Sequence, residues 1–159
     1  MKRRSTQNVD NIDLQIIRIL QEDSRSNYRD IANKLRIASG TVFNRIRRLE
    51  ETGVLKCFTI LVDPEKIGYG LTAVILIEAH GKSLIEFEEE IVSMSNVVSV
   101  YKITGDYNIA ITARFRDRHA LDEFVSDLMV MPFITRTAAN IALNVIKEDS
   151  RINRANKPF

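Results

Sequence analysis

The sequence of 159 residues contains one cysteine, two histidines and no tryptophan. The single cysteine, Cys57, cannot form an internal disulfide. With only His80 and His119 beside it, no cluster has the spacing of metal ligands, so we predict no metal site and no cofactor. A nucleophile elbow, a phosphate-binding glycine loop and a dinucleotide-binding fingerprint are also missing. These absences argue against the common enzyme classes, and we assign no catalytic residue.

The sequence also lacks a long apolar run. No stretch approaches the roughly 20 apolar residues that cross a bilayer, and residues 1–11 hold no apolar segment typical of a signal peptide. We therefore expect a cytoplasmic protein with no membrane partner. Hydrophobic residues make up 45% of the chain, which is enough for a substantial core.

Charge is distributed unevenly along the chain. Residues 1–56 hold 12 Lys and Arg against 7 Asp and Glu, whereas residues 57–159 hold 11 against 14. A positive N-terminal part indicates a module that meets a polyanion, followed by a module with another task.

One basic stretch, residues 39–53, organises the N-terminal part. Helical spacing places four apolar residues on one side: Val42, Phe43, Ile46 and Leu49. It places Arg45 at the flank and four polar residues on the other side: Thr41, Asn44, Arg47 and Arg48. A guanidinium matches phosphate or the guanine edge, and asparagine matches adenine. The pattern is typical of a helix in a DNA major groove, although a solvated helix with an ordinary basic face fits this stretch equally well.

Two further helices are expected before this stretch. The first covers residues 12–23, with Asp10 or Asn11 as its N-cap and Asp13 at the positive end of the helix dipole. The second covers residues 28–35. Three helices in this order predict a helix-turn-helix.

A close resemblance to the Lrp/AsnC (feast/famine) family of transcriptional regulators is carried by two segments, IDLQIIRILQEDSRSNYRDIANKL and TVFNRIRRLEETGVLKCFTILVDPEKIG. The similarity extends over nearly the whole chain. It implies a winged-type helix-turn-helix that binds double-stranded DNA. The candidate DNA-binding residues are Ser39, Thr41, Asn44, Arg45, Arg47 and Arg48.

Two residues depart from the family's pattern before the basic helix. Arg36 stands where the family usually has a turn glycine, and Ala38 stands where it has a capping serine. We therefore expect Ser39 to cap the helix one residue later.

Residues 54–62 read as a strand that Asp63-Pro64 ends, because proline lacks the donor that a continued ladder needs. The resemblance implies that this strand links two domains and helps to pair two subunits. We divide the chain into a DNA-binding domain, a linker, a second domain and a polar tail: residues 1–56, 57–70, 71–147 and 148–159.

The second domain repeats a pattern at an offset of 37 residues. Leu84, Phe87, Ile91 and Met94 recur as Leu121, Phe124, Leu128 and Met131, each set marking one amphipathic helix. Four strands flank these helices: residues 71–80, 96–104, 107–115 and 137–147. The order predicts a ferredoxin-like βαββαβ domain in an α+β protein, as the family resemblance also implies.

The first of these strands, LTAVILIEA, is apolar on both faces. Two helices can cover only one face of a sheet, so we expect the other face to pack on a second copy of the chain. A few exposed aliphatic side chains would be the alternative. We expect a dimer that assembles further into a tetramer or octamer.

A tight turn at Gly105-Asp106 joins the two middle strands. From these residues alone, a plain turn is the simpler interpretation. The family resemblance implies that an amino-acid effector binds here, between dimers, with its ammonium and carboxylate held by side-chain and backbone groups. The candidate effector-binding residues are Tyr101, Gly105, Asp106, Tyr107, Thr135 and Thr137. Phe133 and Ala139 depart from the family's usual glycine and threonine.

Two alternatives remain at this point. Some haem-pathway decarboxylases resemble the same two-domain build, and a ligand-sensing oligomer could have lost DNA binding. Neither would need the cationic face of residues 39–53.

Overall fold

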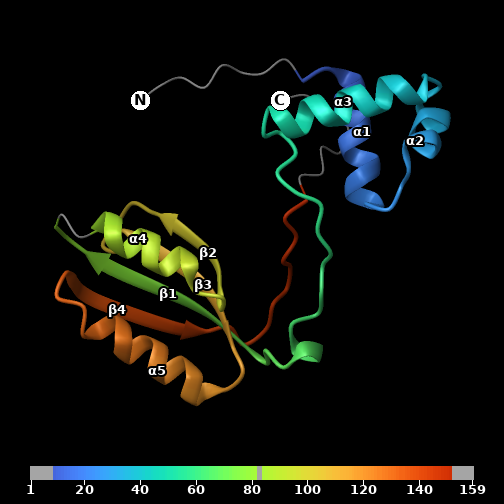
Figure 1. The fold of residues 1–159 in the computed structure, drawn as a ribbon. Coiled ribbons are helices and arrows are strands. Elements are labelled where there is room, and N and C mark those ends of the chain that lie inside the picture. Colours follow the sequence, from blue (N-terminus) through green and yellow to red (C-terminus); the bar gives the residue numbers. More distant parts are fainter. Residues whose placement is uncertain (1–8, 82–83, 152–159) are drawn as a thin grey trace. The chain divides into compact units, whose positions relative to one another are not determined.

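The computed structural model describes residues 9–81 and 84–151, and the chain divides into two compact units (Figure 1). The first unit runs up to Leu61 and also includes the described residues 149–151, and the second is Val62–Glu148. Residues 1–8 of the expected DNA-binding domain and residues 152–159 of the expected polar tail lie outside the described residues. No described helix combines the length and apolar character needed to cross a membrane.

Three helices form the first unit: α1 (Asn11–Glu22), α2 (Tyr28–Leu35) and α3 (Ser39–Glu51). Local capping explains where α1 begins, since the Asp10 carboxylate accepts from the Asp13 N–H at 2.9 Å and the Asp13 carboxylate accepts from the Asp10 N–H at 3.0 Å. The core of this unit is a cluster of buried apolar side chains from all three helices: Ile16, Leu20, Ile31, Ala32, Val42 and Ile46. The predicted helix-turn-helix is confirmed.

The connection from α2 to α3 contains both departures from the family's sequence pattern. Arg36 adopts the left-handed conformation, with φ of 56°, that a turn glycine would take without strain. The N-cap of α3 is Ala38, which offers no side-chain acceptor, and Ser39 is already helical. The prediction that Ser39 caps this helix is therefore wrong, because the Ala38 carbonyl starts the helix by accepting from the Thr41 and Val42 N–H groups.

The strand predicted for residues 54–62 is absent from this chain, whose residues 56–63 form neither helix nor strand. Phe58, Ile60 and Leu61 are exposed there. The prediction is wrong for the single chain, because a strand needs a partner and none of the strands in the described residues pairs with this segment. A short 3₁₀ helix, Glu65–Ile67, follows Pro64.

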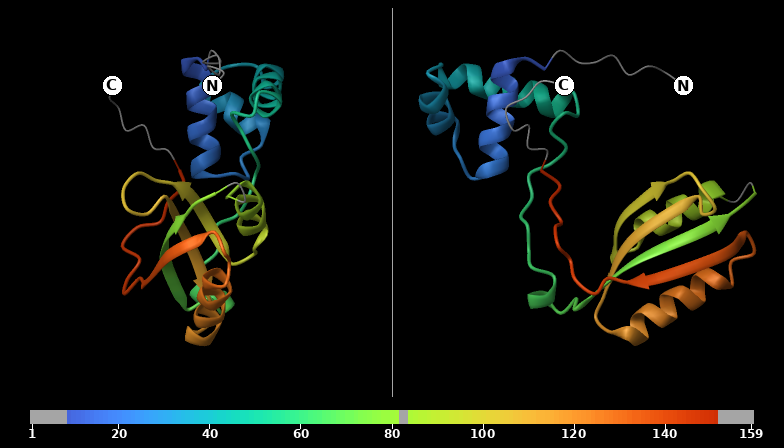
Figure 2. Two further views of the ribbon diagram at one scale, coloured as in Figure 1. Left: turned by 90° about the vertical axis from the view of Figure 1, so that its left-hand side faces the viewer. Right: turned by 180° about the vertical axis from the view of Figure 1, so that it is seen from behind.

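The second unit is a four-stranded antiparallel sheet with two helices. Its elements are β1 (Leu71–Ala79), α4 (Leu84–Ser93), β2 (Val97–Lys102), β3 (Ile109–Phe115), α5 (Arg118–Met129) and β4 (Ile134–Ile141). The strand order β2-β3-β1-β4 and the βαββαβ connections confirm the predicted ferredoxin-like domain (Figure 2). The last strand begins earlier and ends earlier than predicted. Ala73 of β1 pairs with Ile141, and the Ala142 N–H still bonds the Thr72 carbonyl at 2.9 Å. Because β1 begins at Leu71, it is too short to pair with the rest of residues 142–147.

The two faces of β1 have different surroundings. Ala73, Ile75 and Ile77 are completely buried, and they share a core with Phe87 of α4 and Leu128 of α5. On the opposite face, Val74 is 40% exposed and Leu76 is half-buried. Both faces of β1 are thus apolar, as predicted, and within one chain the helices cover only one of them.

Candidate nucleic-acid interface and effector site

The solvent-facing side of α3 is polar except at one position. Val42, Ile46 and Leu49 point into the core, whereas Thr41, Asn44 and Arg47 are exposed. Phe43, predicted to face the core, is instead 45% exposed. It lies about 100° around the helix from Val42, at the flank of the buried stripe, so its burial could not be read from helical spacing.

Arg45 and Arg48 of this basic helix are held by α1. Arg45 Nη1 lies 2.6 Å from Asp10 Oδ2 and 2.9 Å from Asp13 Oδ1. Arg48 Nη2 donates to Asp13 Oδ2, and the Asp13 side chain is completely buried. The two guanidinium groups therefore join α3 to α1 through one buried carboxylate. Sequence reasoning missed this role of Asp13, which lies 32 and 35 residues from its partners.

This cluster of Arg45, Arg48, Asp10 and Asp13 also lowers the pKa of one of its carboxyl groups. The hydrogen bond from Arg45 and, next, the backbone N–H of Asp13 lower the pKa of the Asp10 carboxyl below its ordinary value. Because the folded state favours the ionised form, the contribution of Asp10 to stability is present above about pH 4 and is lost as the pH falls through the lowered pKa.

Arg47 is the basic residue of α3 that is held least firmly. Its Nε lies 2.8 Å from Glu51 Oε1 on the next turn, and both side chains are exposed. Exposed pairs of this kind contribute little, so the guanidinium can turn to a phosphate or a base at small cost. At the start of α3, a Cβ at Gly40 would meet no atom of this chain within 4 Å, which leaves room for a close partner.

The candidate effector residues lie near the end of β2, in the connection from β2 to β3, and on β4, which β1 separates from β3. Gly105 has φ of 118°, which confirms the expected reversal at this turn. Asp106 is exposed, and no hydrogen bond or ion pair reaches it within the described residues. The Asn108 side chain fixes the turn to the end of β1, since it bonds the Ala79 N–H at 3.0 Å and the Ala79 carbonyl at 2.6 Å. Tyr101 lies exposed on β2.

Arg136 of β4 lies at the same end of the sheet. Sequence reasoning did not identify this residue as part of the candidate site. Its guanidinium lies 5.0 Å from the centre of the Tyr107 ring and 3.7 Å from Glu78 Oε2. Thr135 donates its hydroxyl to the Glu78 carbonyl at 3.0 Å, whereas the buried hydroxyl of Thr137 has no hydrogen-bond partner among the described residues. Arg136 and Asp106, for which the described residues offer no partner, thus place opposite charges at one end of the sheet, and a zwitterion requires both.

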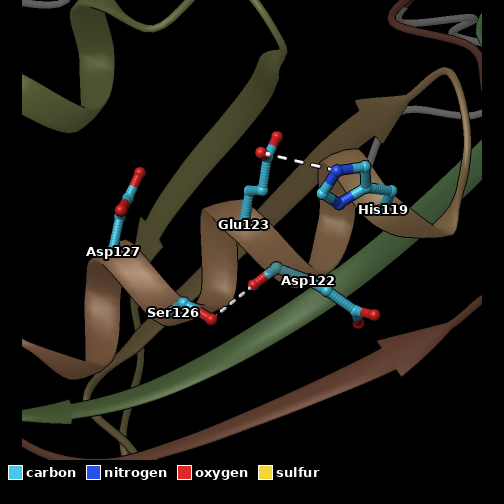
Figure 3. A pocket seen from close by; sticks show the side chains of 5 residues that line it. All are labelled: His119, Asp122, Glu123, Ser126 and Asp127. Carbon is cyan, nitrogen blue, oxygen red and sulfur yellow. Dashed lines mark hydrogen bonds and ion pairs between the residues drawn. The ribbon is translucent and has the colours of Figure 1, made fainter.

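A separate hollow lies along α5, and its side chains project from one helix face (Figure 3). The imidazole of His119 lies 3.7 Å from Glu123, and the Ser126 hydroxyl donates to the Asp122 carbonyl at 2.8 Å. The hydroxyl is thus bonded to backbone rather than to a base, which does not fit a hydrolytic site. No cluster of potential metal ligands occurs in residues 9–81 and 84–151.

A three-helix unit with an exposed basic helix, joined to a ferredoxin-like unit, defines a DNA-binding regulator. Family models support both parts: a winged helix-turn-helix DNA-binding model matches residues 9–56, and the Lrp/AsnC ligand binding domain matches residues 72–152. The chain belongs to the Lrp/AsnC family of transcriptional regulators.

Relatives and solved structures agree with this assignment. An uncharacterized HTH-type transcriptional regulator of Pyrococcus furiosus is 42% identical over 144 residues, covering 91% of this chain and 97% of the relative. The regulator FL11 of Pyrococcus horikoshii is 33% identical over 144 residues, covering 91% and 95%. An AsnC family regulator from Agrobacterium tumefaciens superposes with a TM-score of 0.83 at 28% identity, covering 91% and 96%. A feast or famine regulatory protein from M. tuberculosis, complexed with L-methionine, superposes with a TM-score of 0.81 at 25% identity. The match covers 91% of this chain and 98% of that protein.

Proposed function

We propose that this regulator reads DNA sequence with the exposed face of α3, works as a dimer or larger assembly, and changes its DNA binding when an amino acid binds near Asp106. The observation that carries the DNA-reading role is the exposure of Thr41, Asn44 and Arg47 on a helix whose opposite side is core. An exposed amide and an adaptable guanidinium can match base edges or phosphates in a major groove. Ser39, at the start of α3, can contact the sugar-phosphate backbone of the DNA.

In this proposal Arg45 and Arg48 mainly hold α3 against α1, whereas Arg47 is available to the DNA. Both are tied to Asp13, so they fix how α3 lies on α1, while Arg48 remains 48% exposed and keeps donors for a phosphate. Base reading then falls chiefly to Asn44 and Arg47.

The test of this proposal is a selection of duplex DNA from a random library by the full chain. Fluorescence anisotropy then compares the selected duplex with a scrambled duplex at two salt concentrations. We expect a preference for the selected duplex, with an affinity for both that falls as salt rises. Equal binding to both duplexes would contradict sequence reading.

The open face of the sheet supports dimerisation, since Val74 and Leu76 would be buried if two copies packed there face to face. Replacing Val74 with glutamate is expected to dissociate the dimer, because two carboxylates would then meet in an apolar interface. Sedimentation velocity measures the change. Val92 of α4 is 68% exposed, and V92E provides the matched control. A V74E variant with the mass of the wild-type assembly would exclude this face as the interface.

The effector proposal rests on two charges at the same end of the sheet: the Asp106 carboxylate between β2 and β3, with no partner among the described residues, and the Arg136 guanidinium on β4. Replacing Asp106 with alanine is expected to abolish the heat of amino-acid binding in calorimetry, because the ligand's ammonium loses its acceptor. Unfolding should not change, since Asp106 is exposed. The exposed Asp122 on α5 supplies the control variant D122A. An unchanged binding heat in D106A would rule out this role.

Coupling between the two sites follows from linkage. An amino acid that binds one assembly of dimers more tightly shifts the population toward that assembly. If the assemblies also differ in affinity for DNA, this shift changes the observed DNA affinity, and the coupling free energy is the same in both directions. Two subunits place two copies of α3 on successive half-sites, so the geometry of the assembly decides whether both fit.

A further inference from the structure

One apolar side chain interrupts the polar face of α3. Phe43 is 45% exposed and lies at the edge of the polar face, between the buried stripe and the exposed residues Asn44 and Arg47. Its ring meets the ring of Tyr28, the first residue of α2, edge to face, with centroids 5.6 Å apart and planes at 70°. Tyr28 is also 45% exposed, so the rest of the described chain covers each of the two residues only in part. Phe43 thus stands on the helix that carries the proposed DNA-reading residues, and Tyr28 contacts it from α2.

The chemistry of the surroundings limits what can cover this aromatic pair. Asn44 adjoins Phe43, and the side chains of Arg29 and Arg47 are exposed on the same two helices. A basic and polar rim favours a polyanion over an apolar protein surface. Within a major groove, the apolar group that a phenyl ring can contact is the C5 methyl of thymine.

We propose that Phe43 is a specificity-determining residue that contacts a thymine methyl group, and that Tyr28 positions its ring. The edge-to-face contact restricts the rotation of the Phe43 side chain, so the ring presents one edge to the DNA. The inference rests on the proposed function, because it requires α3 to lie in the major groove. It adds an apolar contact to the hydrogen-bonding residues Asn44 and Arg47.

Deoxyuridine provides the test, because it pairs as thymine does and lacks only the C5 methyl. Each thymine of the selected duplex is replaced in turn, and the dissociation constant of the full chain is measured by anisotropy. We expect replacement at one thymine of each half-site to weaken wild-type binding about fourfold, the effect of losing one buried methyl. For Phe43→Ala, the thymine and deoxyuridine duplexes should bind equally at that position.

Four further variants keep the result interpretable. Phe43→Leu retains an apolar side chain and should keep part of the sensitivity, even if the alanine variant folds poorly. Tyr28→Phe preserves the ring and should behave as wild type, whereas Tyr28→Ala should reduce the sensitivity to deoxyuridine. Val92→Ala, on the other unit, shortens an exposed apolar side chain and should leave the sensitivity intact.

The outcomes separate the inference from the proposed function. Tight, sequence-specific binding that ignores every deoxyuridine would overturn the thymine contact and leave DNA reading by α3 standing. Equal sensitivity in wild type and Phe43→Ala would do the same. A selection that enriches no duplex would overturn the proposed function, and the thymine contact with it.

Discussion

Replacing Arg47 with alanine is expected to weaken binding to the selected duplex by about 10- to 100-fold, the range for loss of one bidentate base contact. If Arg47 contacts a phosphate instead, scrambled duplex should weaken equally and the salt slope should fall by about one. In both cases affinity drops, because the pair with Glu51 is exposed and leaves the guanidinium available to DNA. Anisotropy on both duplexes at two salt concentrations distinguishes the two contacts.

The chain supplies a closely matched control for this variant. Arg18 pairs with Glu22 on α1 with the same spacing of four residues, an Nε to Oε1 distance of 3.0 Å and similar exposure. Arg18→Ala removes the same charge and the same kind of ion pair from a helix that is not expected to enter the groove. If the two variants weakened binding equally, the loss would come from net charge, and Arg47 would have no special position.

Replacing Asp13 with asparagine is expected to lower the free energy of unfolding of the first unit by about 2 kcal/mol. Breaking a buried ion pair typically costs about 3–5 kcal/mol of stability. The expected loss is smaller here, because Arg45 and Arg48 are partly exposed and can be solvated by water when the pair is broken. Hydrogen exchange of the amides of α1 and α3 measures the change locally. The second unit should be unaffected.

Asp122→Asn serves as the control for the Asp13 variant, since it makes the same chemical change at an exposed position of α5. A change of less than about 0.5 kcal/mol in Asp13→Asn, the size expected of an ordinary surface substitution, would show that this buried carboxylate does not join the two helices.

The helices of the first unit could be predicted closely because their signals are local. The bounds of α2 agree with the prediction, and α1 begins at the cap that Asp10 provides. By contrast, the ties from Asp13 to Arg45 and Arg48 join residues more than 30 positions apart, and helical spacing carries no information about them. The exposure of Phe43 was missed for a related reason, since a residue at the flank of a stripe can face either way.

Strands were harder to predict because a strand depends on its neighbour. Residues 54–62 have the composition of a strand, yet no described strand pairs with them. Their apolar side chains stay exposed except Leu55, which packs against the core of the first unit. At the effector site, the reversal at Gly105 was predictable from glycine's freedom at positive φ. The contribution of Arg136 was not, because its place beside Tyr107 depends on how β4 pairs with β1.

The central claim is that α3 lies in the major groove, and dimethyl sulfate protection tests it most directly. The reagent methylates guanine N7 in the major groove and adenine N3 in the minor groove. On the selected duplex, the wild-type protein is expected to protect guanine N7 in each half-site and to leave adenine N3 there reactive. Protection of adenine N3 alone, with every guanine N7 still reactive in the bound complex, would contradict the account.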